Sequence, residues 1–330
     1  MPSGGGKKDL SEYADIRTPD EAVEPILAPA VRDALMDWLT EIWAQKELEA
    51  AGVVPRQKAF FFGPPGTGKT TLAHHLAARL GLDLVIVRAE TIIDSWLGGS
   101  ARNLSNMFEL AQDYGPCVLF FDEFDALGAK RKSDTRGGGA QEERNYTLTI
   151  MLQRMEAFKG IMIAASNTEQ ELDAAIWRRF QIQIEVALPG QKEREHILAR
   201  YLHPWGLPEE FLMALAESFA TASPALMREF CEGLKRQIIL GPKLGRPMSR
   251  DAVISRILAT IHPHPDFGKP RLWSKGLNDE AVRVMPWPLP AANELSKAAT
   301  SKRKKKQDGN VISITRKGLT TSTPDRCRDA

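Results

Sequence analysis

Short apolar runs recur through the first part of the chain, and segments with helical spacing separate them. The runs lie at residues 59–62, 84–87, 117–121, 161–165 and 182–186. Strand-length runs that are apolar at nearly every position are typical of parallel strands buried on both faces of a sheet. The pattern therefore predicts an α/β fold, with helices on both faces of a parallel sheet and a ligand site at the carboxyl ends of the strands.

The pattern changes after Pro189, where only helical spacing remains. Apolar positions three and four residues apart predict helices over residues 193–202, 209–219, 224–240 and 250–261. A helical pattern also precedes the first run, from Glu21 to Ile42. We therefore assign residues 21–189 to a large α/β domain and residues 190–261 to a small all-α lid domain.

The remaining segments carry little periodic signal. Residues 1–20 begin with a glycine-rich stretch and contain few apolar positions, which predicts a flexible arm. Residues 262–290 are rich in proline and tryptophan, which predicts an extended segment that docks through its tryptophans, or a linker. Residues 291–330 are polar and include a basic run at 302–306, which predicts a disordered tail.

The turn after the first apolar run has the composition of a phosphate-binding loop. Residues 63–70 read Gly-Pro-Pro-Gly-Thr-Gly-Lys-Thr, and a helical pattern follows them. Strand, glycine-rich loop and helix in this order let backbone N–H groups surround phosphates, which predicts a P-loop NTPase fold that binds ATP. Lys69 would reach the β- and γ-phosphates, and the Thr70 hydroxyl would hold Mg²⁺. The predicted nucleotide-binding residues are Gly63, Pro64, Pro65, Gly66, Thr67, Gly68, Lys69, Thr70 and Thr71.

Polar residues follow two later apolar runs, at the expected edge of the sheet. Asp122 and Glu123 come directly after the run at 117–121, and Asn167 follows the run at 161–165. Asp122 is predicted to bind Mg²⁺, directly or through water, and Glu123 to orient and polarise the attacking water. The amide of Asn167 would hold that water and sense the γ-phosphate, although an ordinary turn asparagine would look the same.

These motifs together resemble the AAA family of ATPases, within the wider AAA+ group, from about Glu21 to Leu240. Residues 63–70 resemble Walker A, residues 118–125 resemble Walker B, and Asn167 matches sensor 1. Arg178 and Arg179 resemble the paired arginine fingers of the microtubule-severing and Vps4-like single-ring branch. The resemblance implies ring or spiral hexamers in which each subunit inserts these arginines into its neighbour's site. A solvated basic pair is the alternative interpretation.

Trp96, Leu97 and Gly98 resemble the first pore loop of AAA unfoldases. In that family an aromatic side chain from each subunit grips a polypeptide in the central channel, and Trp96 would supply a large, stiff contact face. A core tryptophan at a helix start is the alternative. One departure from the family is the sensor 2 region, which has Pro-Ala at 224–225 in place of the usual Gly-Ala and leaves the role of Arg228 open.

Composition narrows the picture further. The chain has 43% hydrophobic and 26% charged residues and a net charge of +2, so it lacks the charge excess of a nucleic-acid-binding protein. The three cysteines lack metal-ligand spacing, and neither a signal-peptide pattern nor an apolar run near the ~20 residues of a membrane span is present. We therefore expect a cytoplasmic protein without a membrane span.

Together these features predict an ATP-hydrolysing, protein-remodelling motor that assembles as a homo-oligomer and threads polypeptide past Trp96. It has no recognisable protease motif, so proteolysis would require a separate partner. The alternative is a nucleic-acid-associated AAA+ ATPase, such as a loader or mobile-element regulator, which the basic run at 302–306 favours. A non-hydrolysing scaffold is a third hypothesis, which Lys69, Glu123 and Arg178 argue against.

Overall fold

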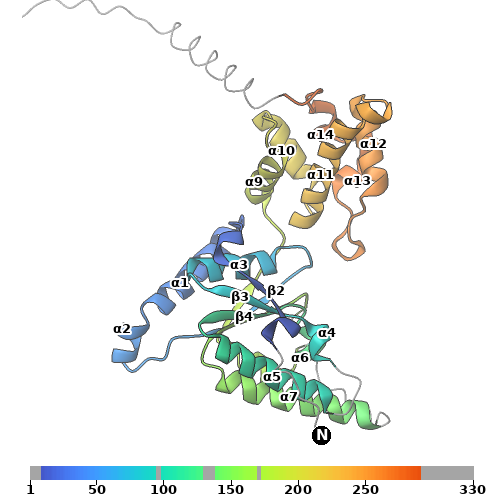
Figure 1. Cartoon of the computed structure of the whole chain (residues 1–330). Coiled ribbons are helices and arrows are strands. Elements are labelled where there is room, and N and C mark those ends of the chain that lie inside the picture. Colours follow the sequence, from blue (N-terminus) through green and yellow to red (C-terminus); the bar gives the residue numbers. More distant parts are fainter. Residues whose placement is uncertain (1–8, 94–97, 129–137, 169–171, 291–330) are drawn as a thin grey trace, which may run out of the picture.

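A computed structural model of the chain describes residues 9–93, 98–128, 138–168 and 172–290 (Figure 1). The described residues contain one six-stranded sheet, with the order β1-β3-β4-β5-β2-β6. Its strands are β1 (Ala14–Arg17), β2 (Lys58–Phe62), β3 (Asp83–Val87), β4 (Cys117–Phe121), β5 (Ile161–Ser166) and β6 (Ile182–Glu185). All neighbouring strands are parallel except β1 and β3, which are antiparallel. The predicted α/β fold with a mostly parallel sheet is therefore confirmed.

Helices cover both faces of this sheet, as Figure 1 shows. The helices of this domain are α1 (Pro29–Trp43), α2 (Gln45–Ala50), α3 (Lys69–Arg79), α4 (Ala89–Ile92), α5 (Gly99–Tyr114), α6 (Asp125–Gly128), α7 (Gly138–Ala157) and α8 (Ala174–Trp177). Successive strand residues enter opposite cores: Leu119 and Phe121 of β4 pack with α5 and α7, whereas Val118 and Phe120 pack with α1 and α3. This division explains the nearly continuous apolar runs, because both faces of each strand are buried.

Residues 9–20 differ from the flexible arm that is predicted over residues 1–20, of which residues 1–8 lie outside the described ranges. Leu10 and Tyr13 are only 3% and 2% exposed, and β1 pairs with β3 from Ala14↔Val87 to Arg17↔Leu84. The arm prediction is therefore wrong for these residues, because a four-residue strand held by backbone hydrogen bonds leaves too little periodic signal. The helix expected from Glu21 also starts later, at Pro29, where proline suits the first turn.

The second domain is all-helical and contains more of the chain than predicted. Its helices are α9 (Gln191–Leu202), α10 (Glu209–Ser218), α11 (Pro224–Leu240), α12 (Arg250–Thr260), α13 (Arg271–Lys275) and α14 (Glu280–Val284). Leu272, Trp273 and Val282 join the same core as Phe211 and Phe230.

The segment at 262–290 is therefore partly helical rather than extended, and it is not a linker. It does pack on the small domain through Trp273 and Trp287, as its tryptophans suggested, so this domain continues beyond the predicted boundary at 261. Its prolines do not interrupt these helices, because Pro270 caps α13 and Pro286 follows α14. The indole N–H groups of Trp273 and Trp287 donate to the carbonyls of Ile261 and Met248, at 2.7 and 2.8 Å. Within the described ranges no helix is long and apolar enough to cross a membrane. The tail over 291–330 lies outside those ranges.

Candidate active site

The loop between β2 and α3 wraps closely enough to require glycine. Gly63 has φ +142°, and a Cβ at that position would lie 2.3 Å from the Val186 carbonyl oxygen. Gly66 has φ +75°, and its Cβ would lie 2.9 Å from the Cβ of Ala225. The loop ends at the N-terminus of α3, where free backbone N–H groups favour an anion. The local geometry therefore fits a bound phosphate chain.

Lys69 is held inside this loop. Its ammonium donates to the carbonyls of Gly63 and Pro64 at 2.8 and 3.0 Å and to Asn167 Oδ1 at 2.9 Å. The side chain is only 7% exposed, and burial lowers the pKa of the ammonium, while Asp122 and Asp125 oppose that shift. The structure thus brings two predicted site residues, Lys69 and Asn167, into direct contact across the ends of β2 and β5.

The acidic residues after β4 contact the start of α3 through Thr70. Thr70 Oγ1 donates to Asp122 Oδ2 at 2.6 Å, and the Glu123 N–H donates to Asp122 Oδ1 at 3.0 Å. Glu123 has a left-handed backbone, with φ +49°, and its side chain is exposed. A hydroxyl and a carboxylate side by side are ligands that Mg²⁺ prefers. This donor set fits a magnesium-bound nucleotide.

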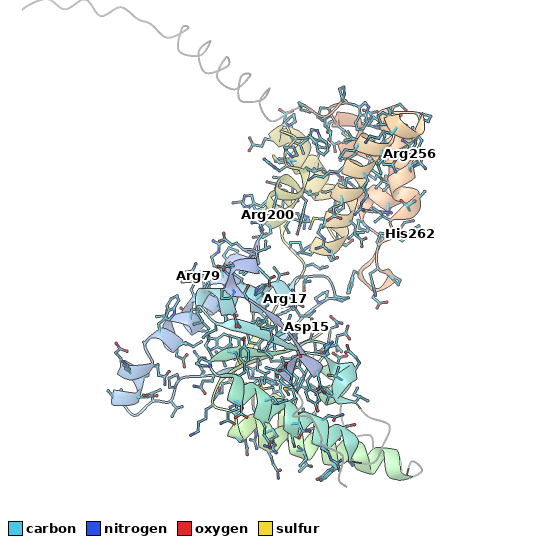
Figure 2. All side chains as sticks on the ribbon, viewed as in Figure 1. Asp15, Arg17, Arg79, Arg200, Arg256 and His262 are labelled. Atoms are coloured by element: carbon cyan, nitrogen blue, oxygen red, sulfur yellow. The ribbon has the colours of Figure 1, made fainter. Side chains whose placement is uncertain are left out.

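These residues line a cavity of about 350 Å³ between the two domains. Pro65, Gly66, Gly68, Lys69, Thr70, Thr71, Asp122, Glu123 and Asn167 come from the large domain, and Tyr201, Pro224, Ala225 and Arg228 from the small one. The Ala225 N–H donates to the Gly66 carbonyl at 3.2 Å. Arg200 of α9 also donates to the Glu24 carbonyl at 2.5 Å, and it is labelled near the junction of the domains in Figure 2. The small domain therefore closes one side of the cavity.

Tyr201 is a lining residue that the sequence analysis missed. It belongs to α9 and packs partly against the core of the small domain. In the sequence it falls beside Leu202 in an apolar helical pattern, so nothing separates it from an ordinary core residue. Arg228 lines the same cavity but is 54% exposed, and its Nε lies 3.8 Å from Glu232 Oε1.

The predicted arginine fingers lie away from the chain's own cavity. Arg178 and Arg179 follow α8, are both exposed, and are absent from the residues that line the cavity. Arg179 forms an ion pair with Glu156. The Arg178 side chain forms no hydrogen bond or ion pair with another described residue. The structure therefore separates these arginines from Lys69 and Glu123 within one chain.

The pore-loop prediction falls largely on residues that the structure does not describe. Trp96 and Leu97 lie outside the described ranges. Gly98, with φ +78°, precedes the first residue of α5. The roles predicted for these three residues therefore stay predictions.

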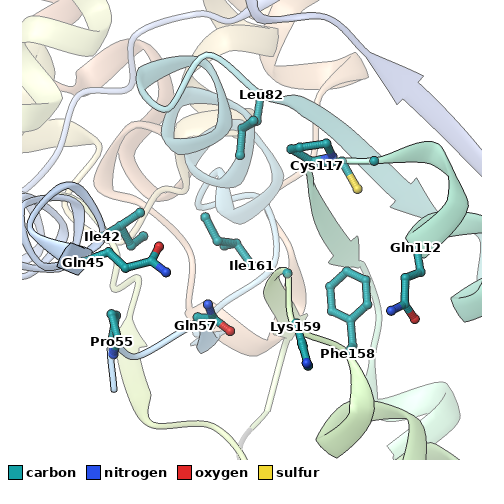
Figure 3. A pocket seen from close by; sticks show the side chains of 13 residues that line it. Ile42, Gln45, Pro55, Gln57, Leu82, Gln112, Cys117, Phe158, Lys159 and Ile161 are labelled. Carbon is teal, nitrogen blue, oxygen red and sulfur yellow. The ribbon is translucent and has the colours of Figure 1, made fainter. Parts of the chain in front are cut away.

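A second cavity, of about 310 Å³, contains none of the predicted site residues (Figure 3). It lies at the amino ends of the parallel strands, opposite the predicted site, because its lining includes Cys117 and Ile161, the first residues of β4 and β5. Ile42, Pro55 and Phe158 add apolar walls. The candidate active site is instead the cavity between the domains, where the charged side chains and the glycine-rich loop converge.

Comparisons with known proteins agree with this geometry. Residues 59–188 match the family model described as ATPase family associated with various cellular activities (AAA). The chain is 31% identical over 237 residues to 26S proteasome regulatory subunit 10B homolog A of Arabidopsis thaliana, covering 66% of this chain and 58% of that protein. It is 34% identical over 190 residues to the proteasome-activating nucleotidase of Methanopyrus kandleri, covering 56% and 43%.

A further relative is the ATP-dependent zinc metalloprotease FtsH 1 of Alkaliphilus metalliredigens, which is 37% identical over 202 residues, covering 59% of this chain and 32% of that protein. The match thus spans 58% or less of the length of each of these relatives. They do not test the narrower resemblance to the Vps4-like branch, which stays a prediction. The matched region contains the whole loop, Lys69, Asp122, Glu123 and Asn167, so residues 59–188 are an ATPase domain of the AAA family.

Proposed function

We propose that this protein is an ATP-driven protein-remodelling motor that works as a ring-shaped homo-oligomer. The observation that carries the proposal is the convergence of Lys69, Asn167, Thr70 and Asp122 in one cavity closed by the small domain. The similarity to a proteasome-activating nucleotidase and to a proteasome regulatory subunit supports a protein as the substrate.

ATP would bind with its phosphates in the loop at residues 63–70. The Lys69 ammonium now donates to two loop carbonyls, and it would exchange one of these bonds for phosphate oxygens. Thr70 and Asp122 would hold Mg²⁺, which supplies neutralisation of the phosphate charge. Tyr201 also lines the cavity and would be the aromatic side chain available to stack on the base.

Hydrolysis requires a water aligned with the γ-phosphorus. Glu123 would orient this water and accept its proton as the oxygen forms a bond to phosphorus and the bond to the β–γ bridging oxygen breaks, leaving ADP and phosphate. Asn167 would contact the γ-phosphate or the water, since its amide already lies at Lys69.

The neighbouring subunit would complete the site. Arg178 is exposed and has no charged partner among the described residues, so it is available to a second copy of the chain. There it would stabilise the charge that develops in the transition state. Arg179 would reach the same site after leaving Glu156.

Loss of the γ-phosphate would be transmitted to the small domain through α11. The N-terminus of α11 contacts Gly66 through Ala225, and Ser223 Oγ caps this helix at the Leu226 N–H. A change in the loop would therefore tilt the small domain against the sheet. In a ring, this motion would move Trp96, Leu97 and Gly98 along a polypeptide. A separate partner, such as a protease, would receive the threaded polypeptide.

The test is to capture the substrate with a variant that binds ATP without turning it over. Glu123→Gln, purified from its own cells with ATP and Mg²⁺, should retain specific polypeptides, and Glu123→Gln with Trp96→Ala should lose them. Mass spectrometry identifies the polypeptides, and nuclease treatment identifies nucleic acid. Nucleic acid retained whatever residue stands at 96 would refute threading and favour the nucleic-acid alternative. Unchanged ATP turnover in Glu123→Gln would refute the assignment of the water-orienting residue.

A further inference from the structure

The Glu123 backbone is unusual for a residue with a side chain. Glu123 is the only described residue other than glycine with a positive φ, at +49°. Side chains disfavour this conformation, so surrounding contacts must hold it. The contacts on both sides of Glu123 therefore decide where its carboxylate points.

The turn after Glu123 is tied to the end of β5. The Phe124 N–H donates to the Ala165 carbonyl at 2.8 Å, and Ser166 Oγ lies 2.9 Å from Asp125 Oδ1. Ser166 is only 1% exposed, so water cannot readily replace that bond. The one proton of the Ser166 hydroxyl faces two acceptors, Asp125 Oδ1 and the Thr168 carbonyl oxygen at 2.8 Å, and the hydroxyl oxygen accepts the Thr168 N–H at 3.2 Å. It therefore joins the turn containing Glu123 to the residues on both sides of Asn167.

The Phe124 ring supports the same arrangement. Phe124 is fully buried between Phe121 and Phe180, with ring centroids 5.7 and 5.8 Å apart. Its backbone and side chain are thus fixed immediately after Glu123, while Asp122 is fixed immediately before it by Thr70. One side-chain bond still joins the turn after β4 to the end of β5, namely the bond between Ser166 and Asp125. A small substitution can remove it.

We infer that Ser166 and Asp125 form a positioning pair that holds Glu123 and Asn167 in register on the two sides of the reacting phosphate. The inference rests on the proposed function, in which Glu123 orients the attacking water. Neither member of the pair needs to touch ATP. Losing the bond leaves the Lys69 bonds to the loop carbonyls and the Thr70–Asp122 bond in place, so ATP binding should survive while the water is misplaced.

The test is Ser166→Ala, with Ser166→Thr as the conservative variant that keeps the hydroxyl. A misplacement near 1 Å lowers turnover by about 10- to 100-fold, so we expect that loss in kcat for Ser166→Ala, with the ATP KM and the Kd within about twofold. Ser166→Thr should restore most of the kcat. Asp125→Ala should lower kcat to a similar extent, and combining it with Ser166→Ala should add little, because both break one bond.

A matched control exists in the small domain. Ser218 is also buried and donates to a carboxylate, Asp279 Oδ1, at 2.6 Å. Ser218→Ala should destabilise the fold while leaving kcat within about twofold, since it lies outside the site. An equal fall in kcat for Ser218→Ala and Ser166→Ala would overturn the positioning role.

The outcomes separate this inference from the proposed function. If Glu123→Gln abolishes turnover while Ser166→Ala is normal, or Ser166→Thr fails to restore the rate, the positioning pair is refuted alone. If ATP affinity falls as far as kcat in Ser166→Ala, the hydroxyl supports the loop rather than the water, which also refutes the pair. If Glu123→Gln still hydrolyses ATP, the proposed function fails first.

Discussion

Replacing Asp279 tests whether the C-terminal helices are an integral part of the small domain. The Asp279 side chain is fully buried and accepts hydrogen bonds from Ser218 Oγ at 2.6 Å, Ala281 N at 2.9 Å and Arg271 Nε at 3.0 Å. It thereby joins α10, α13 and α14. We expect Asp279→Ala to destabilise this domain more than any exposed charge in it would.

The magnitude follows from the three bonds. The bond from Ala281 N caps α14, and losing a cap costs about 1 kcal/mol. Breaking a buried ion pair costs about 3–5 kcal/mol. Arg271 is 28% exposed and still has Glu217 at 3.4 Å as a partner. The cost of breaking its ion pair with Asp279 is therefore at the low end of that range. A total of about 4 kcal/mol results, while Asp279→Asn, which keeps an acceptor oxygen, should cost about 1–2 kcal/mol.

Urea unfolding and peptide-resolved hydrogen exchange measure the effect. Exchange should accelerate in α10, α13 and α14 while the strands of the large domain are unchanged. Asp251→Ala is the matched control, because Asp251 is an exposed partner of Arg250 in the same domain and should cost less than about 1 kcal/mol. A loss below about 1 kcal/mol for Asp279→Ala, or faster exchange only in the sheet, would refute the reasoning.

Further predictions concern the nucleotide site. Burial lowers the pKa of Lys69 below 10.5, so rising pH removes its charge earlier than in an ordinary lysine, and ATP affinity measured by calorimetry should fall as pH approaches 10.5. Lys69→Arg should abolish that fall, because a guanidinium stays charged. Gly66→Ala should weaken ATP binding and cost about 1–3 kcal/mol in urea unfolding, because its Cβ would lie 2.9 Å from Ala225 at φ +75°. Arg178→Ala should lose hydrolysis, and mixing it with Lys69→Ala should partly restore the ATPase rate, because intact sites form between the two variants.

Each of these has a result that contradicts it. If ATP affinity fell with pH in the same way for Lys69→Arg and the natural protein, a group other than Lys69 would cause the fall. Gly81 has a similar φ of +70° but nothing within 4 Å of an added Cβ, so Gly81→Ala separates backbone strain from the contact with the small domain. Equal losses of ATP affinity in both glycine variants would exclude the Ala225 contact as the cause. No restored hydrolysis at any mixing ratio would argue against a shared site.

The sequence predicted the strands of the sheet well where both faces of a strand are buried. In β4 every residue from Cys117 to Phe121 is buried, so the apolar run and the strand coincide. The loop at residues 63–70 was also predictable, because its glycines, lysine and threonine form a local pattern of residue types. The structure then explains two of these glycines by their positive φ and by close contacts with Val186 and Ala225. Lys69 and Asn167 then meet because β2 and β5 are neighbours and their carboxyl ends share one edge.

Other features depend on contacts that no local pattern contains. β1 is held by backbone bonds to β3, which any residues between Ala14 and Arg17 could form. The helices around Trp273 rest on a buried carboxylate, Asp279, that looks like an ordinary capping residue in the sequence. The backbone of Glu123 follows from tertiary contacts, since glutamate itself disfavours a positive φ.

The short strand β1 has a consequence for whether the folded protein stays in solution. By pairing with β3, it covers backbone N–H and C=O groups that would otherwise form an open edge of the sheet. An open edge is a template on which another chain can add a strand, and β3 is apolar from Leu84 to Val87. A version of the chain starting at residue 21 would retain every predicted catalytic residue, yet we expect it to self-associate through β3 and precipitate before its ATPase rate could be measured.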